Sequence, residues 1–515
     1  MVSLQGVQHL PRKSIGYLHY LASVFKKSFL AGLAIVPAGS HAAPTSALPD
    51  VPAAWRAAAQ ADIEAAVHIT RANHPGARDP DNPGFLRHLD QARHHGLSLA
   101  ARVGDLAGYV AAVQGFNTRI QDGHAGLTVR IDKSALPKRR WPGFVTVWRG
   151  DGLYVYQAEP GQPAVGSKLL ACDGRSPEQL IRENVFGFQG RVAEAGQWWA
   201  HARDLFVDTR NPFIQLPHRC RFALHGEATE HVLEWRDIDA QAERWFADSR
   251  DGETRPVGMI EPRKNLYWVS MPTFHPDEAE RAAYRSINRD IAQHRARYLG
   301  ADAIVVDLRS NGGGSSSWAE DFAKALWGEN RVRQALAAFM AKTQVWWRAS
   351  PANTDYVFWV AEQLAKQGQE DDAVWARTQA EGMRAALRRG EPFHVELPEN
   401  DAGDAAADDG PAFTRPLYVV VPGDCASACL DAVDVFTRFP NTILIGAPSS
   451  ADSPYMEMRR EDLASGLAAV RVPNKMYVNR GRGNGKVYYP DIPVTELVWS
   501  VDSLLKVVER DLARR

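Results

Sequence analysis

This chain of 515 residues has little net charge, few long apolar runs and only four cysteines. Its formal net charge is −1, and lysine and arginine are scattered rather than gathered in a basic block between aromatics. This pattern gives no indication of a nucleic-acid-binding surface. The composition, 45% hydrophobic and 23% charged, is ordinary for a globular protein. The length predicts two or three domains.

The N-terminal region has the pattern of a secretory signal. Lys26 and Lys27 precede an apolar run at 28–39, and the small residues Ser40 and Ala42 follow it. A membrane anchor is the alternative, but this run is about 12 residues long and a span needs roughly 20. We therefore predict a signal peptide at 1–42, cleaved after Ala42, and a periplasmic or secreted protein with no stable membrane anchor after cleavage. Cleavage removes four basic residues and no acidic one, which leaves a net charge of −5.

The four cysteines suit an exported protein but do not reveal their own pairing. They allow three disulfide patterns, and small buried thiols are the alternative to any disulfide. Cys425 and Cys429 flank Ser427, so a bridge between them would stiffen that turn. The other two are Cys172 and Cys220.

The order of helical and strand-like segments predicts three regions after the signal. A helical cap is expected over 43–128, a β-rich domain over 141–240 and an α/β core over 255–515. In the core, apolar strands alternate with helices, which is typical of a largely parallel, layered sheet. Examples are strands at 301–309, 417–421 and 442–448, and one long helix over 277–298.

Ser427 lies where one of these strands gives way to a helix. The run LYVVV is followed by a Pro-Gly-Asp turn and then by apolar residues at three-residue steps. Free N–H groups and the helix dipole at such a junction can stabilise a developing anion, so the position suits a nucleophile. It equally suits a serine that caps the helix.

Two further glycine-bearing turns carry candidate chemistry. Gly312 and Gly313 follow the strand predicted at 301–309, and glycine backbone N–H groups can face a ligand, as in an oxyanion hole. His124 lies in a tight turn with Asp122 and with glycines on either side. A lone histidine is usually structural, but this setting favours a functional one.

Together, these segments resemble peptidase family S41, which includes the C-terminal processing proteases and the tricorn protease core. The motifs that carry the resemblance are AIVVDLRSNGGG, PLYVVVPGDCASACLD and YYPDIPV, and QDGHAGL matches the tricorn-like branch. The resemblance implies a crotonase/ClpP-like βαβ spiral core with an N-terminal helical cap and an inserted PDZ-like β domain. Residues 163–181 are similar to a PDZ strand, Asp-Gly turn and helix, and a plain β-rich spacer is the alternative.

The resemblance also implies the roles of individual residues. Ser427 matches the nucleophile, and the N–H of Ala428 with one near Gly312 or Gly313 matches the oxyanion hole. Processing proteases use a lysine about 25 residues after the serine, but Asp452 stands there and no lysine lies between Ser427 and Lys475. The tricorn-like branch uses a cap histidine instead, which His124 matches.

The third catalytic member has two candidates. Asn484 lies near the place of that branch's acidic residue, and Asp122 precedes His124 by two positions. The sequence thus predicts an exported serine endopeptidase that acts on polypeptides, with no metal, nucleotide or other cofactor implied. The alternatives are an inactive peptide- or ligand-binding protein on this fold and a serine acyl hydrolase that is not a peptidase.

Overall fold

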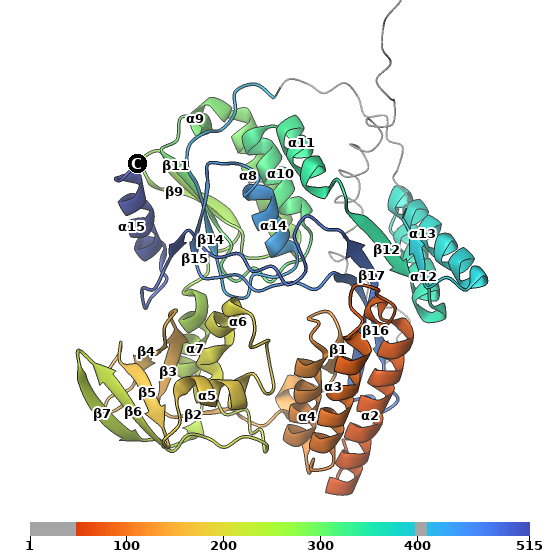
Figure 1. Ribbon diagram of the computed structural model, residues 1–515. Coiled ribbons are helices and arrows are strands. Elements are labelled where there is room, and N and C mark those ends of the chain that lie inside the picture. Colours follow the sequence, from red (N-terminus) through yellow and green to blue (C-terminus); the bar gives the residue numbers. More distant parts are fainter. Residues whose placement is uncertain (1–47, 397–408) are drawn as a thin grey trace, which may run out of the picture.

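The computed structural model describes residues 48–396 and 409–515, so the predicted signal peptide lies outside the described residues. A six-stranded sheet forms the centre of the molecule, in the order β18-β15-β14-β11-β10-β9 (Figure 1). Five of its strands are parallel, and β9 pairs antiparallel with β10. The strands are β9 (Gly258–Arg263), β10 (Leu266–Ser270), β11 (Ala303–Asp307), β14 (Leu417–Val421), β15 (Thr442–Gly446) and β18 (Ile492–Pro493).

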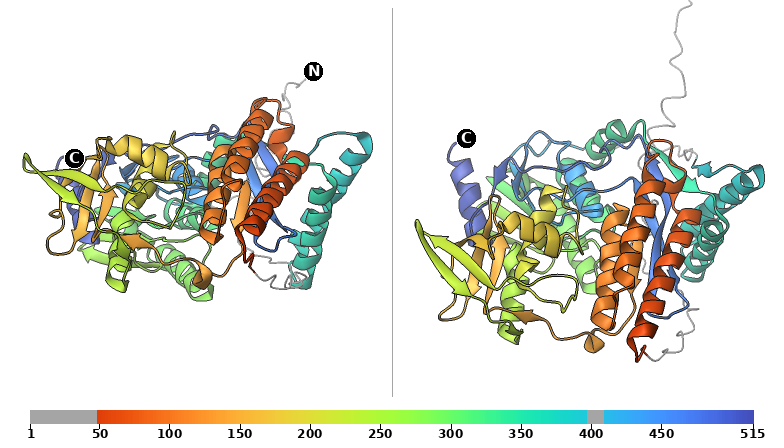
Figure 2. Two further views of the ribbon diagram at one scale, coloured as in Figure 1. Left: turned by 90° about the horizontal axis from the view of Figure 1, so that it is seen from below. Right: turned by 60° about the horizontal axis from the view of Figure 1, so that its bottom comes forward.

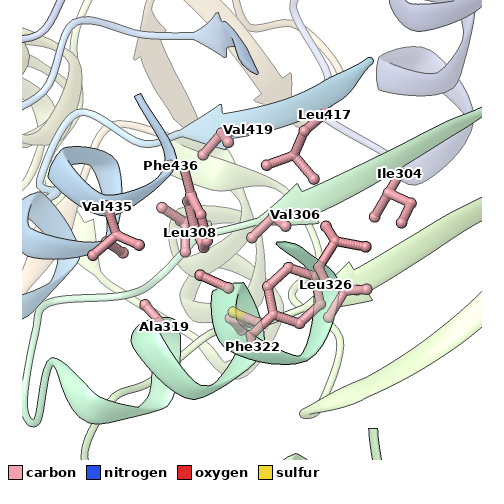
Figure 3. Packing of buried hydrophobic residues seen from close by; sticks show 14 of the residues in the cluster. Ile304, Val306, Leu308, Ala319, Phe322, Leu326, Leu417, Val419, Val435 and Phe436 are labelled. Atoms are coloured by element: carbon pink, nitrogen blue, oxygen red, sulfur yellow. The ribbon is translucent and has the colours of Figure 1, made fainter. Parts of the chain in front are cut away.

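Both faces of this sheet are buried, as its almost uninterrupted apolar strands predict. Because side chains alternate along a strand, Ile304 and Val306 of β11 face one layer and Val305 faces the other. Figure 3 shows the first layer, where Val306 lies beside helix side chains such as Phe322 and Phe436. The helices near the core sheet are α8 (Glu278–Gln293), α9 (Arg295–Leu299), α10 (Ser317–Trp327), α11 (Glu329–Met340) and α14 (Ala428–Phe436), with α15 (Val501–Leu512) on the second face.

The prediction of one continuous helix over 277–298 is wrong. The segment forms two helices, because His294 leaves the helical backbone with φ −114° and ψ 33°. The Nδ1 atom of His294 lies 2.9 Å from Oδ1 of Asp290, one turn earlier.

A second sheet joins the N-terminal helices to the C-terminal part of the chain. Its strand β1 pairs antiparallel with β17, so residues 126–129 lie against 468–471. Both views in Figure 2 show the cap helices beside these strands. The cap consists of α2 (Pro52–Asn73), α3 (Phe85–Ala100) and α4 (Leu106–Ile120). The sheet consists of β1 (Gly126–Val129), β12 (Gln344–Arg348), β13 (Phe393–Val395), β16 (Tyr455–Asp462) and β17 (Ala468–Val478), and the hairpin α12 (Pro351–Lys366) and α13 (Glu370–Arg389) packs beside it.

The β-rich region is a five-stranded antiparallel sheet in the order β3-β4-β5-β6-β7. A disulfide between Cys172 and Cys220 joins β5 to β6, one of the pairings that the sequence left open. The strands are β3 (Phe144–Trp148), β4 (Leu153–Ala158), β5 (Lys168–Cys172), β6 (Arg219–Leu224) and β7 (Glu227–Val232). Beside them lie β2 (Arg140–Trp141), β8 (Arg236–Asp237), α5 (Pro177–Leu180), α6 (Ala195–His201) and α7 (Ala240–Asp251). Within the described ranges, no helix is both long enough and apolar enough to cross a membrane.

Candidate active site

Ser427 joins β14 to α14 in a strained backbone conformation. Its φ is 57° and its ψ −130°, a region that non-glycine residues rarely adopt, and its side chain makes no hydrogen bond that caps α14. The hydroxyl is therefore not used as a helix cap, although the sequence allowed that role. Strain of this kind persists only where the surroundings hold it, and it gathers at functional sites.

Three neighbours hold the Ser427 turn. A disulfide joins Cys425 to Cys429 across the serine, which is the second pairing that the sequence left open. The Asp452 carboxylate accepts the Ser427 N–H with both oxygens, at 3.0 and 2.9 Å. Gly313 packs against the turn so closely that a Cβ there would lie 2.8 Å from the Cβ of Ser427.

Two buried side chains, Arg309 and Asn311, hold the glycine turn that follows β11. Arg309 is fully buried and binds both oxygens of Asp307, at 2.9 and 2.7 Å. Asn311 accepts the Gly313 N–H at 2.9 Å and donates to the Met271 carbonyl at 2.8 Å. The Gly313 N–H is thus already bound, and the side chains that brace the turn fix where it lies.

Two of the predicted oxyanion donors remain available. Gly312 is exposed, and a Cβ at this position would meet no atom within 4 Å. Neither its N–H nor that of Ala428 donates a hydrogen bond within the described part of the chain. A Cβ at Gly313 would lie 3.2 Å from the Ala428 nitrogen, so the two turns meet at this point.

His124 follows the end of α4 and lies beside a buried carboxylate. Asp122 accepts the His124 backbone N–H at 3.0 Å, and its Oδ1 lies 3.8 Å from Nδ1 of the imidazole. That distance is too long for a hydrogen bond, and Nδ1 is buried without a partner among the described residues. The imidazole is therefore next to a carboxylate that can accept a hydrogen bond from its Nδ1–H after a small adjustment.

Asp122 is held by two more side chains. Nε2 of His74 lies 2.8 Å from Oδ2 of Asp122, and the Ser453 hydroxyl donates to Oδ1 at 2.7 Å. Nδ1 of His74 accepts the Gly76 N–H at 2.9 Å, so His74 carries its proton on Nε2. That Nε2–H donates a hydrogen bond to Asp122. Burial alone would raise the pKa of Asp122, but the side chains of His124 and His74 hold it well below the ordinary range.

The pKa of His124 is shifted in the opposite direction. Burial alone would lower it, but the Asp122 carboxylate, with a smaller contribution from Asp452, raises it above the ordinary histidine value, and Arg191 opposes them. The imidazole therefore keeps its proton to a higher pH than an ordinary histidine does. Asp452 thus acts on His124 while it also binds the Ser427 N–H.

The structure brings the Ser427 and His124 turns into one region without a direct bond between them. No hydrogen bond joins the two side chains in the described ranges, and the link runs through the adjacent residues Asp452 and Ser453. Catalytic hydrogen bonds are often loose before substrate binds. The arrangement is compatible with a serine–histidine pair that tightens on binding.

Asn484 lies on the rim of a cavity of about 180 Å³ that is also lined by Asp452 and Arg482. It is exposed, and His124 is not among the residues that line this cavity. Asp122, in contrast, contacts the His124 turn directly. Sequence reasoning named Asp452 only as a replacement for lysine and did not find His74, Ser453 or the buried Arg482, because nothing local marks their partners.

The chain is similar to one peptidase family model and to several solved structures. The family model described as peptidase family S41 matches residues 267–494. Mature CPAF is similar in structure, at 13% identity over 90% of this chain and 98% of that chain, with a TM-score of 0.59. The structure of mature CPAF complexed with lactacystin is 12% identical over 90% of this chain and 100% of that chain, with a TM-score of 0.58. The photosystem II D1 C-terminal processing protease is 13% identical over 86% of this chain and 98% of that chain, with a TM-score of 0.32. None of the curated proteins matches the chain.

These findings identify the class of protein as a serine hydrolase. Residues 267–494 match peptidase family S41, and the protein is a serine-type peptidase.

Proposed function

We propose that this protein is an exported endopeptidase that hydrolyses peptide bonds through an acyl-enzyme on Ser427. The observation that carries the proposal is the Ser427 turn: the serine has a strained backbone, its hydroxyl does not cap the helix, and it lies against a glycine turn with a free N–H. His124 is the general base, and the N–H groups of Gly312 and Ala428 form the oxyanion hole. Gly313 supports this hole by its close packing.

The reaction follows from these positions. His124 takes the Ser427 hydroxyl proton while Oγ attacks the peptide carbonyl carbon. The resulting oxyanion accepts hydrogen bonds from the N–H groups of Gly312 and Ala428. The imidazolium then gives its proton to the amine nitrogen as the C–N bond breaks. A water molecule, deprotonated by His124, attacks the acyl-enzyme and releases the carboxylic acid and Ser427.

Asp122 orients His124 in this proposal. Its position 3.8 Å from Nδ1 and its support by His74 and Ser453 favour it as the third member. The sequence-based candidate for this role, Asn484, is exposed on the cavity rim. The two candidates make different predictions, because Asp122→Asn should impair the base whereas Asn484→Ala should affect only what enters the cavity.

The finer features of the fold belong to the same proposal. The parallel strands with helices on both faces support a crotonase/ClpP-like βαβ spiral. The antiparallel sheet of the β-rich region supports a PDZ-like module that binds a polypeptide by adding a strand at its edge. The proposed signal peptide and two disulfides support export to the periplasm or beyond.

Hydrolysis assays separate this function from its alternatives. A denatured protein such as casein and a small ester are incubated with the wild type and with Ser427→Ala. Cleavage of casein by the wild type alone supports a peptidase, and cleavage of the ester alone supports an acyl hydrolase. If neither is cleaved, the chain is a binding protein. Lactacystin, which mature CPAF binds, is a further ligand to test as an inhibitor.

A further inference from the structure

The short segment 449–453, between β15 and β16, contacts three parts of the molecule at once. Toward the β-rich region, Glu194 accepts the Ala451 N–H at 3.0 Å and Arg191 donates to the Ala451 carbonyl at 2.8 Å. Toward the core, the Ser449 N–H donates to the Tyr488 carbonyl at 2.8 Å. The backbone is therefore fixed immediately before Asp452.

Asp452 and Ser453 point from this fixed backbone to the two halves of the active site. The Asp452 carboxylate binds the Ser427 N–H, and Arg482 holds that carboxylate from the other side at 3.2 Å. The Ser453 hydroxyl donates to Asp122 at 2.7 Å, and Asp122 in turn accepts the His124 N–H. Consecutive Cα atoms are about 3.8 Å apart, so the two contacts are joined by a single stiff peptide unit.

We propose that Asp452 and Ser453 are positioning residues that hold the nucleophile turn and the base turn at the correct separation. This inference rests on the proposed function of Ser427 and His124. It gives a role to the position where a processing protease has its lysine. In this chain Asp452 does not act as the general base. Its negative charge and its hydrogen bond fix the serine turn instead.

Two substitutions separate the effect of the Asp452 charge from that of the hydrogen bond between Ser453 and Asp122. In Asp452→Asn the amide oxygen can still accept the Ser427 N–H, so the geometry is kept while the negative charge is lost. In Ser453→Ala the charge is kept while the link to Asp122 is lost. Asp491→Asn is the matched control, because Asp491 also accepts a backbone N–H, that of Leu444 at 2.8 Å, outside this segment.

The first readout is the pKa of His124, followed by NMR of ¹³Cε1-labelled histidine with His124→Gln to assign the signal. We expect Asp452→Asn to lower this pKa, because a nearby negative charge is removed, and Ser453→Ala not to lower it. The titratable and charged groups that face His124 or its partner Asp122 are Asp122 itself, Asp452, Arg191, His74, Tyr455 and Arg471. A purely structural role would leave the pKa at its wild-type value in both folded variants.

The second readout is the rate at which a fluorophosphonate labels Ser427. Asp452→Asn weakens a hydrogen bond by making its acceptor neutral, and Ser453→Ala removes a hydrogen bond to a charged group. Each variant should therefore label about tenfold more slowly than the wild type, and Asp491→Asn should label at the wild-type rate. The inference is overturned if both variants label at that rate, or if Asp452→Asn leaves the His124 pKa unchanged. If Asp452→Asn does not fold, Ser453→Ala, which removes one hydroxyl, still tests the labelling rate.

The inference and the proposed function fail in different ways. An unlabelled wild type contradicts the proposed function, but the His124 titration needs no catalysis and still tests the contact with Asp452. A labelled wild type with unaffected variants contradicts the inference alone.

Discussion

Gly313→Ala should separate the two turns on which the site depends. The added Cβ would lie 2.8 Å from the Cβ of Ser427, 3.1 Å from the Ala426 carbonyl oxygen and 3.2 Å from the Ala428 nitrogen. Ordinary carbon contacts are about 3.5–4.0 Å, so the turns must move apart by about 0.7 Å or more. The φ of +106° at Gly313 adds strain of about 1–3 kcal/mol for a residue with a side chain.

The expected loss of activity follows from that displacement. A misplacement near 1 Å, or the loss of one oxyanion donor, lowers the rate about 10²-fold or more, while the strain lowers the free energy of unfolding by about 1–3 kcal/mol. Hydrolysis rates and denaturant unfolding measure both. Gly104→Ala is the control, since Gly104 is exposed with no atom near its Cβ position. If Gly313→Ala retained wild-type rates and stability, the close packing of the two turns would be wrong.

Three other predictions test the electrostatics and the disulfides. Activity should fall as the pH falls through the raised pKa of His124, because the base must be neutral. Asp122→Asn should move this limb of the pH profile to lower pH and reduce the rate by about 10²–10⁴-fold. Replacing both Cys172 and Cys220 with serine opens a loop with a sequence separation of 48 and should cost about 4 kcal/mol in chaotrope unfolding. Burial raises the pKa of Asp424 to about 6, so its protonated form stabilises the fold at low pH and this stabilisation is lost as the pH rises through about 6. Asp424→Asn should therefore be more stable than the wild type at pH 8, by up to about 3 kcal/mol, and equally stable near pH 4; equal stability at both values would contradict the shift.

Much of the core could be predicted because its signals are local. The apolar runs of β11, β14 and β15 lie within the predicted strands, since each run is bounded by turn residues. Asp105 caps α4, with its carboxylate 2.8 Å from the Gly108 nitrogen, and aspartate directly before an apolar helical pattern is such a local signal. The long helix over 277–298 was mispredicted because no proline or glycine marks the break at His294.

The site could be predicted only in part. The strand-to-helix position of Ser427 follows from hydrophobic pattern, but its positive φ and its unused hydroxyl depend on packing by Gly313 and on Asp452. The contact between Ser453 and Asp122 joins residues 331 positions apart, and no local pattern carries such information. The disulfide pairing was open for the same reason, because only the fold selects one pattern of three.

The central claim is that Ser427 is a nucleophile activated by His124. The most direct test is mass spectrometry of the intact protein and its peptides after reaction with a fluorophosphonate, at several pH values. We predict one adduct on the peptide that contains Ser427. It should form faster as the pH rises through the His124 pKa, at least 10²-fold more slowly in His124→Gln, and not at all in Ser427→Ala. An unmodified wild type, or labelling of His124→Gln at the wild-type rate, would contradict the claim.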